Sequence, residues 1–257
     1  MKSRYLSEFR RNVSVLWRYI KALQKRESFL TTPFGMVTNA AYFIRRGLYK
    51  TISVIAPTFD GIILDFGCGS KPYRSLFTNV ISYIGVDIMA SGHDHSTSQV
   101  DVYYDGKIIP FADSTFDGVV SFEVFEHIFN LEDTINEIKR VLKNDGQIMI
   151  TMPFAWFEHE QPYDFARYTS FAATHILKKN GFNNIVVKKT TGSTEAIFQL
   201  FIEYIFSIFK SQSLIIRTIV QLLVIFPMTF FSTIFCLLLP KHDDLYCNLV
   251  IVARKLS

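Results

Sequence analysis

The segment ILDFGCGSKPY, residues 63–73, together with YIGVDI, residues 83–88, decides the fold of this chain. The apolar start of the first segment predicts a buried strand, and Gly67 and Gly69 then allow a tight turn whose backbone can touch a ligand. The second segment runs through apolar residues to Asp87, an acid well placed to accept hydrogen bonds from two ribose hydroxyls. A strand, a glycine turn and an acid in this order predict a site for a nucleotide-type cofactor.

The residue three positions after the second glycine limits which cofactor can bind. Dinucleotide enzymes place a third glycine there, so that a helix N-terminus can face the pyrophosphate. This chain has Pro72 at that position, and proline has no amide hydrogen to offer a phosphate. Nicotinamide or flavin binding is therefore unfavourable, and we expect a cofactor without a pyrophosphate.

The two acids and the glycine turn carry a family resemblance. With Asp65 opening the turn and Asp87 closing the second strand, the segment resembles the S-adenosylmethionine site of class I methyltransferases. The resemblance implies that Asp65 organises the turn around the methionine amino group, that the glycines lie under the cofactor, and that Asp87 holds the ribose. The residues expected to bind the cofactor are Asp65, Gly67, Cys68, Gly69, Asp87, Ile88, Asp105, Gly106 and Ser121.

Segments further along the chain extend the resemblance. Asp105 and Gly106 precede IIPFADSTFD, residues 108–117, which looks like the family segment in which an acid contacts the adenine amino group. Asp105 is expected in that role, with Asp101 as the alternative if the loop register is shifted. The next segments match the family's fourth strand, its helix and its fifth strand, namely GVVSFEVFEHI (118–128), a helix ending in RVLKNDG (140–146), and QIMITMPF (147–154).

The predicted fold class is α/β. It is a Rossmann-like, seven-stranded class I methyltransferase sheet with helices on both faces, plus an apolar helical insertion between the last two strands, which are expected at residues 184–190 and 246–253. The predicted organisation is basic amphipathic helices at 1–56, the methyltransferase core at 57–190, the insertion at 191–243, and the last strand with the C-terminus at 244–257.

The insertion carries no charged residue from Thr218 to Leu239, a stretch long enough to cross a bilayer. Since its flanking strands belong to one sheet, the insertion must return to the side it left, and a single span is excluded. We expect a helical hairpin with arms at 196–209 and 214–239, or helices lying in the membrane interface. Pro227 is expected to kink the second arm or turn it back. A dimer interface or a lid over an apolar substrate is the alternative.

The N-terminus is basic, with eight Lys and Arg side chains against one acid in residues 1–26. Apolar residues recur there at helical spacing, which predicts an amphipathic helix suited to an anionic lipid surface. A solvated helix packed on the catalytic domain is the alternative. The basic residues interrupt any signal-peptide core. No stacking or base-reading motif accompanies them, so no nucleic acid partner is expected. Three cysteines without paired spacing fit a reducing cytosol.

Two polar clusters follow the fourth and fifth predicted strands, where an open α/β sheet meets its substrate. Glu123, Glu126 and His127 are spaced to share one face at a helix start. The second cluster is EHEQPYDFARYT, residues 158–169. Methyl transfer to a hydroxyl requires a proton acceptor, and the imidazole of His159 is the first choice, with Glu123 as the other catalytic candidate. A surface or structural role for His159 is the alternative.

The first cluster also resembles a metal motif. The Glu-x-x-Glu-His spacing is similar to the divalent-metal motif of small-RNA 2'-O-methyltransferases and of ubiquinone-pathway O-methyltransferases. In the RNA enzymes a further histidine after the fifth strand completes the site, and His159 matches it. The resemblance implies Glu123, Glu126, His127 and His159 as the metal ligands, and it does not specify which ion they bind. In other family members the Glu126–His127 pair packs at the helix start without a metal.

The segment PYDFARYT, residues 162–169, resembles methyltransferases of bacterial polysaccharide and lipopolysaccharide gene clusters, which implies a sugar acceptor. Arg167 can hold a phosphate or carboxylate, and Tyr163 or Tyr168 can stack on a sugar face. A salt bridge between Asp164 and Arg167 is the alternative. We therefore predict a cytoplasmic methyltransferase that O-methylates a glycan or lipid-linked sugar at the cytosolic membrane face. The alternative functions are O-methylation of a prenylated phenol, quinone precursor or other lipid, and a non-catalytic role as a methyltransferase-fold partner of a membrane glycan assembly complex.

Overall fold

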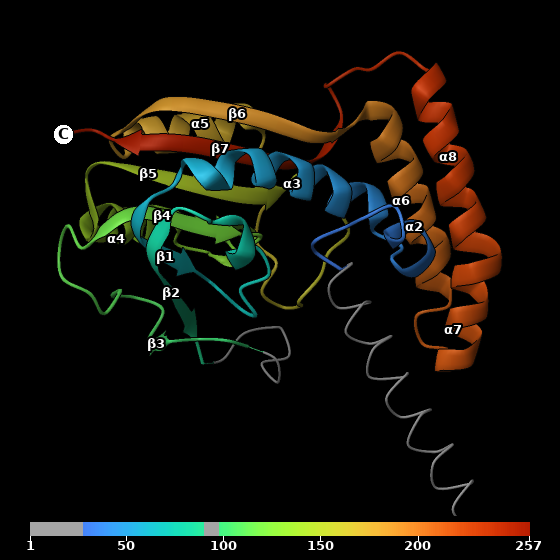
Figure 1. Ribbon diagram of the computed structural model, residues 1–257, viewed down its shortest axis with the longest axis horizontal. Coiled ribbons are helices and arrows are strands. Elements are labelled where there is room, and N and C mark those ends of the chain that lie inside the picture. Colours follow the sequence, from blue (N-terminus) through green and yellow to red (C-terminus); the bar gives the residue numbers. More distant parts are fainter. Residues whose placement is uncertain (1–27, 90–97) are drawn as a thin grey trace, which may run out of the picture.

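The computed structural model describes residues 28–89 and 98–257. Within these ranges seven strands form one sheet in the order β3-β2-β1-β4-β5-β7-β6 (Figure 1). The first five strands run parallel, and β7 lies antiparallel between β5 and β6. The strands are β1 Gly61–Phe66, β2 Val80–Ile88, β3 Val102–Tyr104, β4 Phe116–Phe122, β5 Leu142–Pro153, β6 Phe182–Gly192 and β7 Tyr246–Lys255.

Helices cover both faces of the sheet because the central strands carry apolar side chains on both sides. Leu64 packs into the core beneath α4 (Leu131–Val141) and α5 (Ser170–Lys179), whereas its neighbour Ile63 packs beneath α3 (Tyr42–Ile55). This arrangement confirms the predicted Rossmann-like fold. The shorter helices of the core are α2 Gly35–Thr38 and the 3-10 turns Ala56–Thr58, Arg74–Leu76 and Phe125–His127.

The apolar insertion between β6 and β7 is a helical hairpin. Its first arm is α6 (Ser193–Ile208). Its second arm consists of α7 (Leu214–Val220), a π-helical turn (Gln221–Ile225) and α8 (Phe226–Leu238). Both arms stand beside the end of the sheet toward which β4 and β5 point, next to the N-terminus of α3 (Figure 1). The insertion is thus attached to the same end of the sheet that carries ligands in open α/β folds.

The second arm does not turn back at Pro227, in contrast to one of our expectations. The helix continues from Leu214 to Leu238. Proline cannot donate to the carbonyl four residues earlier, and its ring crowds that carbonyl. The π-helical turn at Gln221–Ile225 lies directly before Pro227, and a wider turn of this kind accommodates such a break in the hydrogen-bond ladder.

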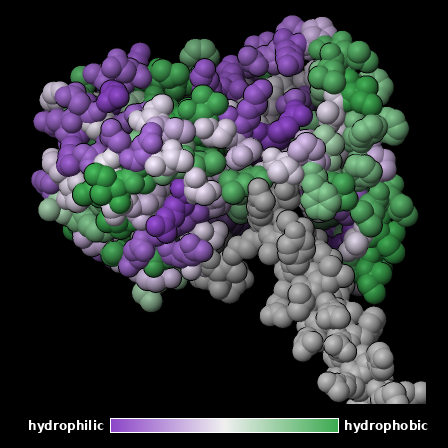
Figure 2. Space-filling view, viewed as in Figure 1, coloured by the Kyte–Doolittle hydropathy of each residue, from purple (hydrophilic) through white to green (hydrophobic). Residues whose placement is uncertain are grey.

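The outer surface of the hairpin is apolar (Figure 2). Within the described residues, Leu214–Leu238 is the one helix that is long and apolar enough to cross a membrane, and only 28% of its apolar window is buried. The inner surface packs on α2 and α3 around a core that includes Phe43, Ile202 and Ile225. The basic amphipathic helix predicted for residues 1–26 lies outside the described residues.

Candidate active site

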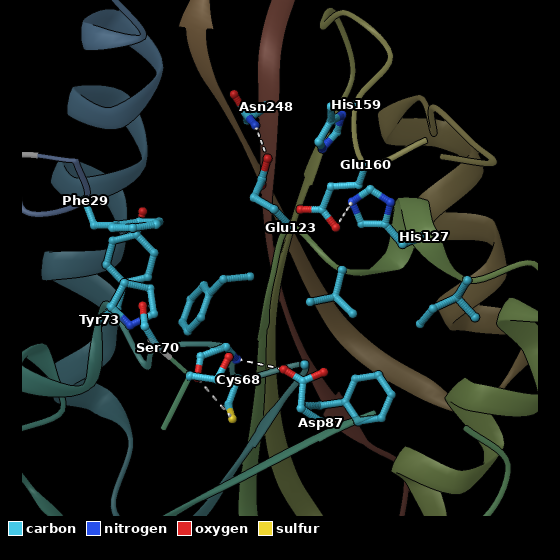
Figure 3. Close-up of a pocket in the computed structure, with 18 of the residues that line it drawn as sticks. Phe29, Cys68, Ser70, Tyr73, Asp87, Glu123, His127, His159, Glu160 and Asn248 are labelled. Atoms are coloured by element: carbon cyan, nitrogen blue, oxygen red, sulfur yellow. Dashed lines mark hydrogen bonds and ion pairs between the residues drawn. The ribbon is translucent and has the colours of Figure 1, made fainter. Parts of the chain in front are cut away.

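A pocket of about 430 Å³ opens at the carboxyl ends of β1, β2 and β4, where open α/β sheets bind ligands. Its floor contains the turn after β1 and Asp87 at the end of β2 (Figure 3). Its opposite side contains Glu123, His127 and His159 from the ends of β4 and β5 (Figure 3). The predicted cofactor turn and the predicted catalytic residues therefore face one cavity.

The turn after β1 has the geometry that its glycines allow. Gly67 and Gly69 adopt φ values of +70° and +46°, in the left-handed region that disfavours side chains. The amides of Gly67 and Cys68 donate to the carbonyl of Val86, at 2.9 and 3.1 Å. The amide of Gly69 donates to Oδ2 of Asp87 at 2.9 Å. The turn is thus fixed to the end of β2 by three hydrogen bonds.

The two glycines differ in the space beside them, which yields a prediction. A Cβ on Gly67 would lie 2.5 Å from Cγ2 of Val124, whereas a Cβ on Gly69 meets nothing within 4 Å. We expect Gly67→Ala to lower the free energy of unfolding by about 1–3 kcal/mol and to weaken cofactor binding. Gly69→Ala is the matched control, because it strains the backbone without creating a side-chain clash. We expect its free energy of unfolding in urea to lie closer to that of wild type. Equal losses in the two variants would show that the contact with Val124 is unimportant.

Asp65 lies buried beneath the turn and accepts a hydrogen bond from the hydroxyl of Tyr83 at 2.8 Å. Burial raises the pKa of the Asp65 carboxyl from 3.8 to about 7, against the opposing effect of the Tyr83 hydrogen bond. It is not among the described residues that line the pocket. Its place fits a role in holding the turn rather than direct contact with the reacting atoms.

This raised pKa predicts a pH-dependent effect of Asp65→Asn. The folded protein holds the proton more tightly than the unfolded chain, so the contribution of Asp65 to stability falls as the pH rises from about 4 to about 7. Asparagine keeps an acceptor for Tyr83 without a charge. We expect the stability advantage of Asp65→Asn over wild type to grow by roughly 2–3 kcal/mol between pH 5 and pH 8. Urea unfolding at both pH values measures it, and an advantage that is independent of pH would contradict a titrating Asp65.

Asp87 is buried at the pocket floor, with its carboxylate fixed by backbone amides. Oδ2 accepts from Gly69, and Oδ1 accepts from the amide of Ile88 at 2.8 Å. Cys68 and Ile88 also line the pocket, and burial raises the pKa of the Cys68 thiol. The predicted cofactor residues Gly67, Cys68, Gly69, Asp87 and Ile88 are thus brought together at one end of the cavity.

Asp105 and Gly106 lie elsewhere. Oδ1 of Asp105 accepts from the amides of Lys107 and Ile108, at 2.8 and 3.1 Å, in an exposed turn. Gly106 supplies the positive φ, +81°, that this turn requires. Neither Asp105 nor Gly106 is among the described residues that line the pocket. Adenine contact by Asp105 stays a prediction.

Asp101 and Ser121 have structural partners. The carboxylate of Asp101 pairs with the buried ammonium of Lys71 and accepts from the amide of Gly85 at 2.6 Å. The buried hydroxyl of Ser121 donates to the carbonyl of Phe66 at 2.9 Å. These contacts tie the strand ends together, and both side chains lie outside the described lining of the pocket.

Glu123 follows β4 in a backbone conformation that is rare for a residue with a side chain, with φ at +56°. Its backbone amide donates to the carbonyl and hydroxyl of Thr151. Its Oε2 accepts from the side-chain amide Nδ2 of Asn248 at 2.7 Å. Oε1 is buried with no hydrogen-bond partner among the described residues. Burial raises the pKa of the Glu123 carboxyl.

Glu126 and His127 lie in the 3-10 turn Phe125–His127, not at the start of α4, which begins at Leu131. The predicted helix start is thus wrong, since the positive φ of Glu123 prevents a helix from forming directly after β4. The cluster nevertheless forms, because the 3-10 turn brings both side chains to the end of the sheet.

Glu126, His127 and His159 converge on one point. Nε2 of His127 and Nε2 of His159 lie 3.8 and 3.9 Å from Oε1 of Glu126. The two imidazole centroids are 4.9 Å apart, and ligand-type atoms of the three residues lie within 4.8 Å of one another. Glu160 adds a carboxylate oxygen 3.8 Å from Nε2 of His127. Burial raises the pKa of Glu126 well above its usual value, and the neighbouring Glu123 raises it further.

Backbone and carboxylate acceptors orient both imidazoles. Nδ1 of His127 lies 2.8 Å from the carbonyl of Tyr163, so it donates there and leaves Nε2 with a lone pair. Nδ1 of His159 lies 3.2 Å from Oδ2 of Asp164 and 3.3 Å from the carbonyl of Phe157, which has the same consequence. Burial and the neighbouring His127 hold the pKa of His159 below its usual 6.5. His159 is therefore neutral at pH 7.

None of the three predicted substrate residues is among the described residues that line the pocket. Arg167 forms a two-pronged ion pair with Asp164, whose pKa it holds at about 2. Tyr163 is 48% exposed, and Tyr168 packs against the core beside α5. Arg167 thus forms the salt bridge with Asp164 that we gave as the alternative to substrate binding. Substrate contact by Tyr163, Arg167 and Tyr168 stays a prediction.

Comparison with known proteins identifies the family. Residues 39–184, more than half of the chain, match the model of a methyltransferase domain family. The chain belongs to this methyltransferase family. The match starts just before α3 and ends in β6. The hairpin therefore lies outside the shared domain.

Individual relatives agree with this assignment. The methyltransferase is 34% identical over 126 residues to the mitochondrial ubiquinone biosynthesis O-methyltransferase of Bos taurus, covering 42% of this chain and 34% of the relative. It is 28% identical over 112 residues to an uncharacterised protein of Methanocaldococcus jannaschii, covering 41% of this chain and 48% of that protein. The chain thus spans between about a third and a half of these curated relatives.

Its fold resembles that of phosphoethanolamine N-methyltransferase 2 of Haemonchus contortus, solved with S-adenosyl-L-methionine, with a TM-score of 0.52. The identity is 18%, and the match covers 90% of this chain and 59% of that one. This likeness shows the fold that the two chains share, and together with the family match it makes S-adenosylmethionine the expected cofactor. The open space above Gly69 and the paired oxygens of Asp87 fit the nucleoside end of this molecule.

The donor set of Glu126, His127 and His159 fits a divalent cation. Both carboxylate oxygens of Glu126 and Nε2 of His127 are buried without a hydrogen-bond partner among the described residues, as is Oε1 of Glu123. Buried polar atoms are seldom left unpaired, and the orienting bonds on Nδ1 of His127 and His159 are those that metal-bound histidines usually make. Two imidazoles with carboxylates suit several divalent ions, so the donors do not select one.

Several residues that line the pocket were missed from the sequence. They belong to α3, the turn after β1, the loop after β5, and β7. They are Arg45, Tyr73, Trp156, Glu160 and Asn248. A signal existed for Asn248, a lone polar residue within the apolar strand β7, and for Glu160, within the polar loop after β5. Nothing local marks Arg45, because its place depends on how α3 packs across the sheet, whereas Tyr73 closes the segment 63–73 that the sequence singled out.

Proposed function

We propose that this methyltransferase transfers the methyl group of S-adenosylmethionine to a hydroxyl of a glycan or lipid-linked sugar at the cytosolic face of a membrane. The observation that supports it best is the shared pocket, in which the cofactor turn faces Glu123, His127 and His159 (Figure 3). A methyl donor bound over the turn would have its reacting end next to two oriented imidazoles.

The chain's own residues can orient the cofactor. Asp87 offers its carboxylate to the two ribose hydroxyls, while the amides of Gly69 and Ile88 keep that carboxylate in place. Arg45 is the one Lys or Arg among the described residues that line the pocket, and its guanidinium lies 4.6 Å from the centroid of the Phe29 ring. It is the natural partner for the carboxylate of the methionine part. The sulfonium then lies between these two anchors.

The transfer step needs a base for the acceptor hydroxyl. The hydroxyl oxygen forms a bond to the methyl carbon as the carbon–sulfur bond breaks, and S-adenosylhomocysteine leaves as a neutral thioether. Nε2 of His159 accepts the hydroxyl proton, because its Nδ1 is held by Asp164 and its imidazole is neutral at pH 7. The same Asp164 is fixed by Arg167, so the imidazole stays aimed at the pocket.

A divalent cation would be held at the same place by Glu126, His127 and His159, with Glu123 beside them. With such an ion bound, Nε2 of His159 would be a ligand and not the base, and the ion would instead lower the pKa of a hydroxyl that it contacts. The relative from ubiquinone biosynthesis is compatible with O-methylation but does not define the acceptor here. A prenylated phenol or quinone precursor is the second candidate, favoured by that relative and by the apolar hairpin.

The hairpin supports a membrane location. Leu214, Ile215 and Ile216 of α7 are consecutive, and all three are exposed. Since successive helical residues lie 100° apart, these three alone span about 200° of the helix circumference. A protein partner typically covers a stripe of about 100°, whereas lipid covers every exposed side. The first arm exposes apolar side chains too, such as those of Phe201 and Ile208.

Two measurements test the proposal. Transfer of labelled methyl from S-adenosylmethionine is measured with lipid-linked oligosaccharides in one arm and prenylated catechols in the other, each with EDTA and with added manganese. Label on the oligosaccharide supports the proposal, label on the catechol alone supports the second candidate, and label on neither favours a non-catalytic partner.

Flotation with vesicles of phosphatidylglycerol and phosphatidylethanolamine tests the membrane contact. We expect wild type to float and Leu223→Asp with Leu237→Asp to remain in solution. Val54→Asp is the matched control, since Val54 is exposed to the same extent, 74% against 73% for Leu223, but lies on α3. Flotation of the double variant would contradict insertion of the hairpin.

A further inference from the structure

The first turn of α3 is capped from the hairpin, across 156 residues of sequence. Helix α3 follows Ala41, whose methyl side chain cannot accept a hydrogen bond from the free amides of the first turn. Oε1 of Gln199, on α6, accepts from the amide of Phe43 at 3.1 Å. Nε2 of the same side chain donates to the carbonyl of Ala40 at 2.9 Å. One buried amide thus holds both sides of the helix start.

Further contacts fix the same turn to the insertion and to the strand end that leads into it. The hydroxyl of Thr191, at the end of β6, donates to the carbonyl of Phe43 at 3.0 Å. Arg46 pairs with Glu195 of α6 at 2.5 Å. The absence of a side chain at Gly47 permits this approach, because a Cβ there would lie 2.7 Å from Oγ1 of Thr191. The first turn of α3 is therefore held by side chains of α6 and of the end of β6.

The held turn is also a wall of the pocket. Ala41, Ile44 and Arg45 line the cavity, within five residues of the amide that Gln199 caps. We infer that Gln199 is a positioning residue, through which the hairpin sets Arg45 against the methionine carboxylate of the cofactor. This inference rests on the proposed placement of the cofactor, and it gives the insertion a role in cofactor binding in addition to membrane contact.

A pair of ligands separates positioning from a general loss of structure. S-adenosylhomocysteine carries the amino acid carboxylate, whereas 5'-methylthioadenosine has the same nucleoside without it. Gln199→Met keeps the length of the side chain and removes both hydrogen bonds. We expect it to raise the Kd of S-adenosylhomocysteine by about 3- to 10-fold and to leave that of methylthioadenosine unchanged in calorimetric titration. Arg45→Met is expected to show the same selectivity with a larger loss, about 10- to 100-fold.

Additivity supplies the second readout. If Gln199 acts through Arg45, the double variant Arg45→Met with Gln199→Met binds S-adenosylhomocysteine no more weakly than Arg45→Met alone. Thr229→Val is the matched control, since Thr229 is equally buried in the hairpin but its hydroxyl bonds only to Ile225 of its own helix. We expect this variant to bind both ligands as wild type does.

Three outcomes would overturn the inference: equal weakening of both ligands in Gln199→Met, no weakening of either, or full additivity with Arg45→Met. Failure of the wild type to bind S-adenosylhomocysteine is a different result, because it would overturn the cofactor site itself. Binding of S-adenosylhomocysteine that is unaffected by Arg45→Met would overturn the proposed contact with the carboxylate.

Discussion

Replacing His159 with asparagine is expected to lower the rate constant of methyl transfer by about 100- to 10,000-fold, the usual range for a lost general base. Nε2 of His159 faces the pocket with its lone pair, because Nδ1 is held by Asp164. Asparagine preserves a polar side chain of similar reach but cannot accept a proton near pH 7. Affinity for S-adenosylhomocysteine should stay within about twofold of wild type, since the histidine lies opposite the cofactor turn.

The pH profile gives this prediction a second measurement. The pKa of His159 is below its usual 6.5, so the base is already deprotonated at pH 7. Activity should therefore be flat from pH 7 upward and fall as the pH drops through the pKa of His159. His175→Asn is the matched control, because His175 is exposed on α5 and is not among the described residues that line the pocket. Full activity in His159→Asn, or equal loss in both variants, would exclude His159 as the base.

Replacing Asp87 with alanine is expected to weaken binding of S-adenosylhomocysteine by about 100-fold or more. The carboxylate has two functions at once. It offers acceptors to the ribose, and its Oδ2 holds the amide of Gly69 at 2.9 Å. Alanine removes the ribose contact and also releases the turn on which the cofactor rests.

Calorimetric titration measures this loss directly, and thermal unfolding is recorded beside it to confirm that the variant is folded. Asp133→Ala is the control, because Asp133 is an exposed acid in the first turn of α4. We expect the control to bind as wild type does. Unchanged affinity in Asp87→Ala would mean that the ribose lies elsewhere in the pocket.

The cofactor turn could be predicted from the sequence because its determinants are local. A buried strand, two glycines with positive φ and an acid at the end of the next strand occupy 25 residues, from Ile63 to Asp87. The sheet and the insertion followed from apolar patterns of the same local kind. Patterns of this kind can be recognised in a sequence without knowledge of tertiary contacts.

Other features depended on contacts between distant segments. Gln199 caps a helix 156 residues away, and Asn248 reaches Glu123 from a strand 125 residues away. The sequence predicted a helix start at Glu123, which is wrong because Glu123 adopts a φ of +56°. A glutamate in a sequence gives no sign of this rare backbone conformation. The ion pair of Asp164 and Arg167 is a local contact instead, three residues apart, and the sequence had offered it as the alternative to substrate binding.

The most direct test of the proposed methyl-transfer site is the crystal structure of the protein with S-adenosylhomocysteine bound. We expect both ribose hydroxyls within hydrogen-bond distance of Asp87 and the sulfur directed toward the cluster of Glu126, His127 and His159. A structure in which the sulfur points away from that cluster, or in which the ligand lies outside this pocket, would contradict methyl transfer at this site.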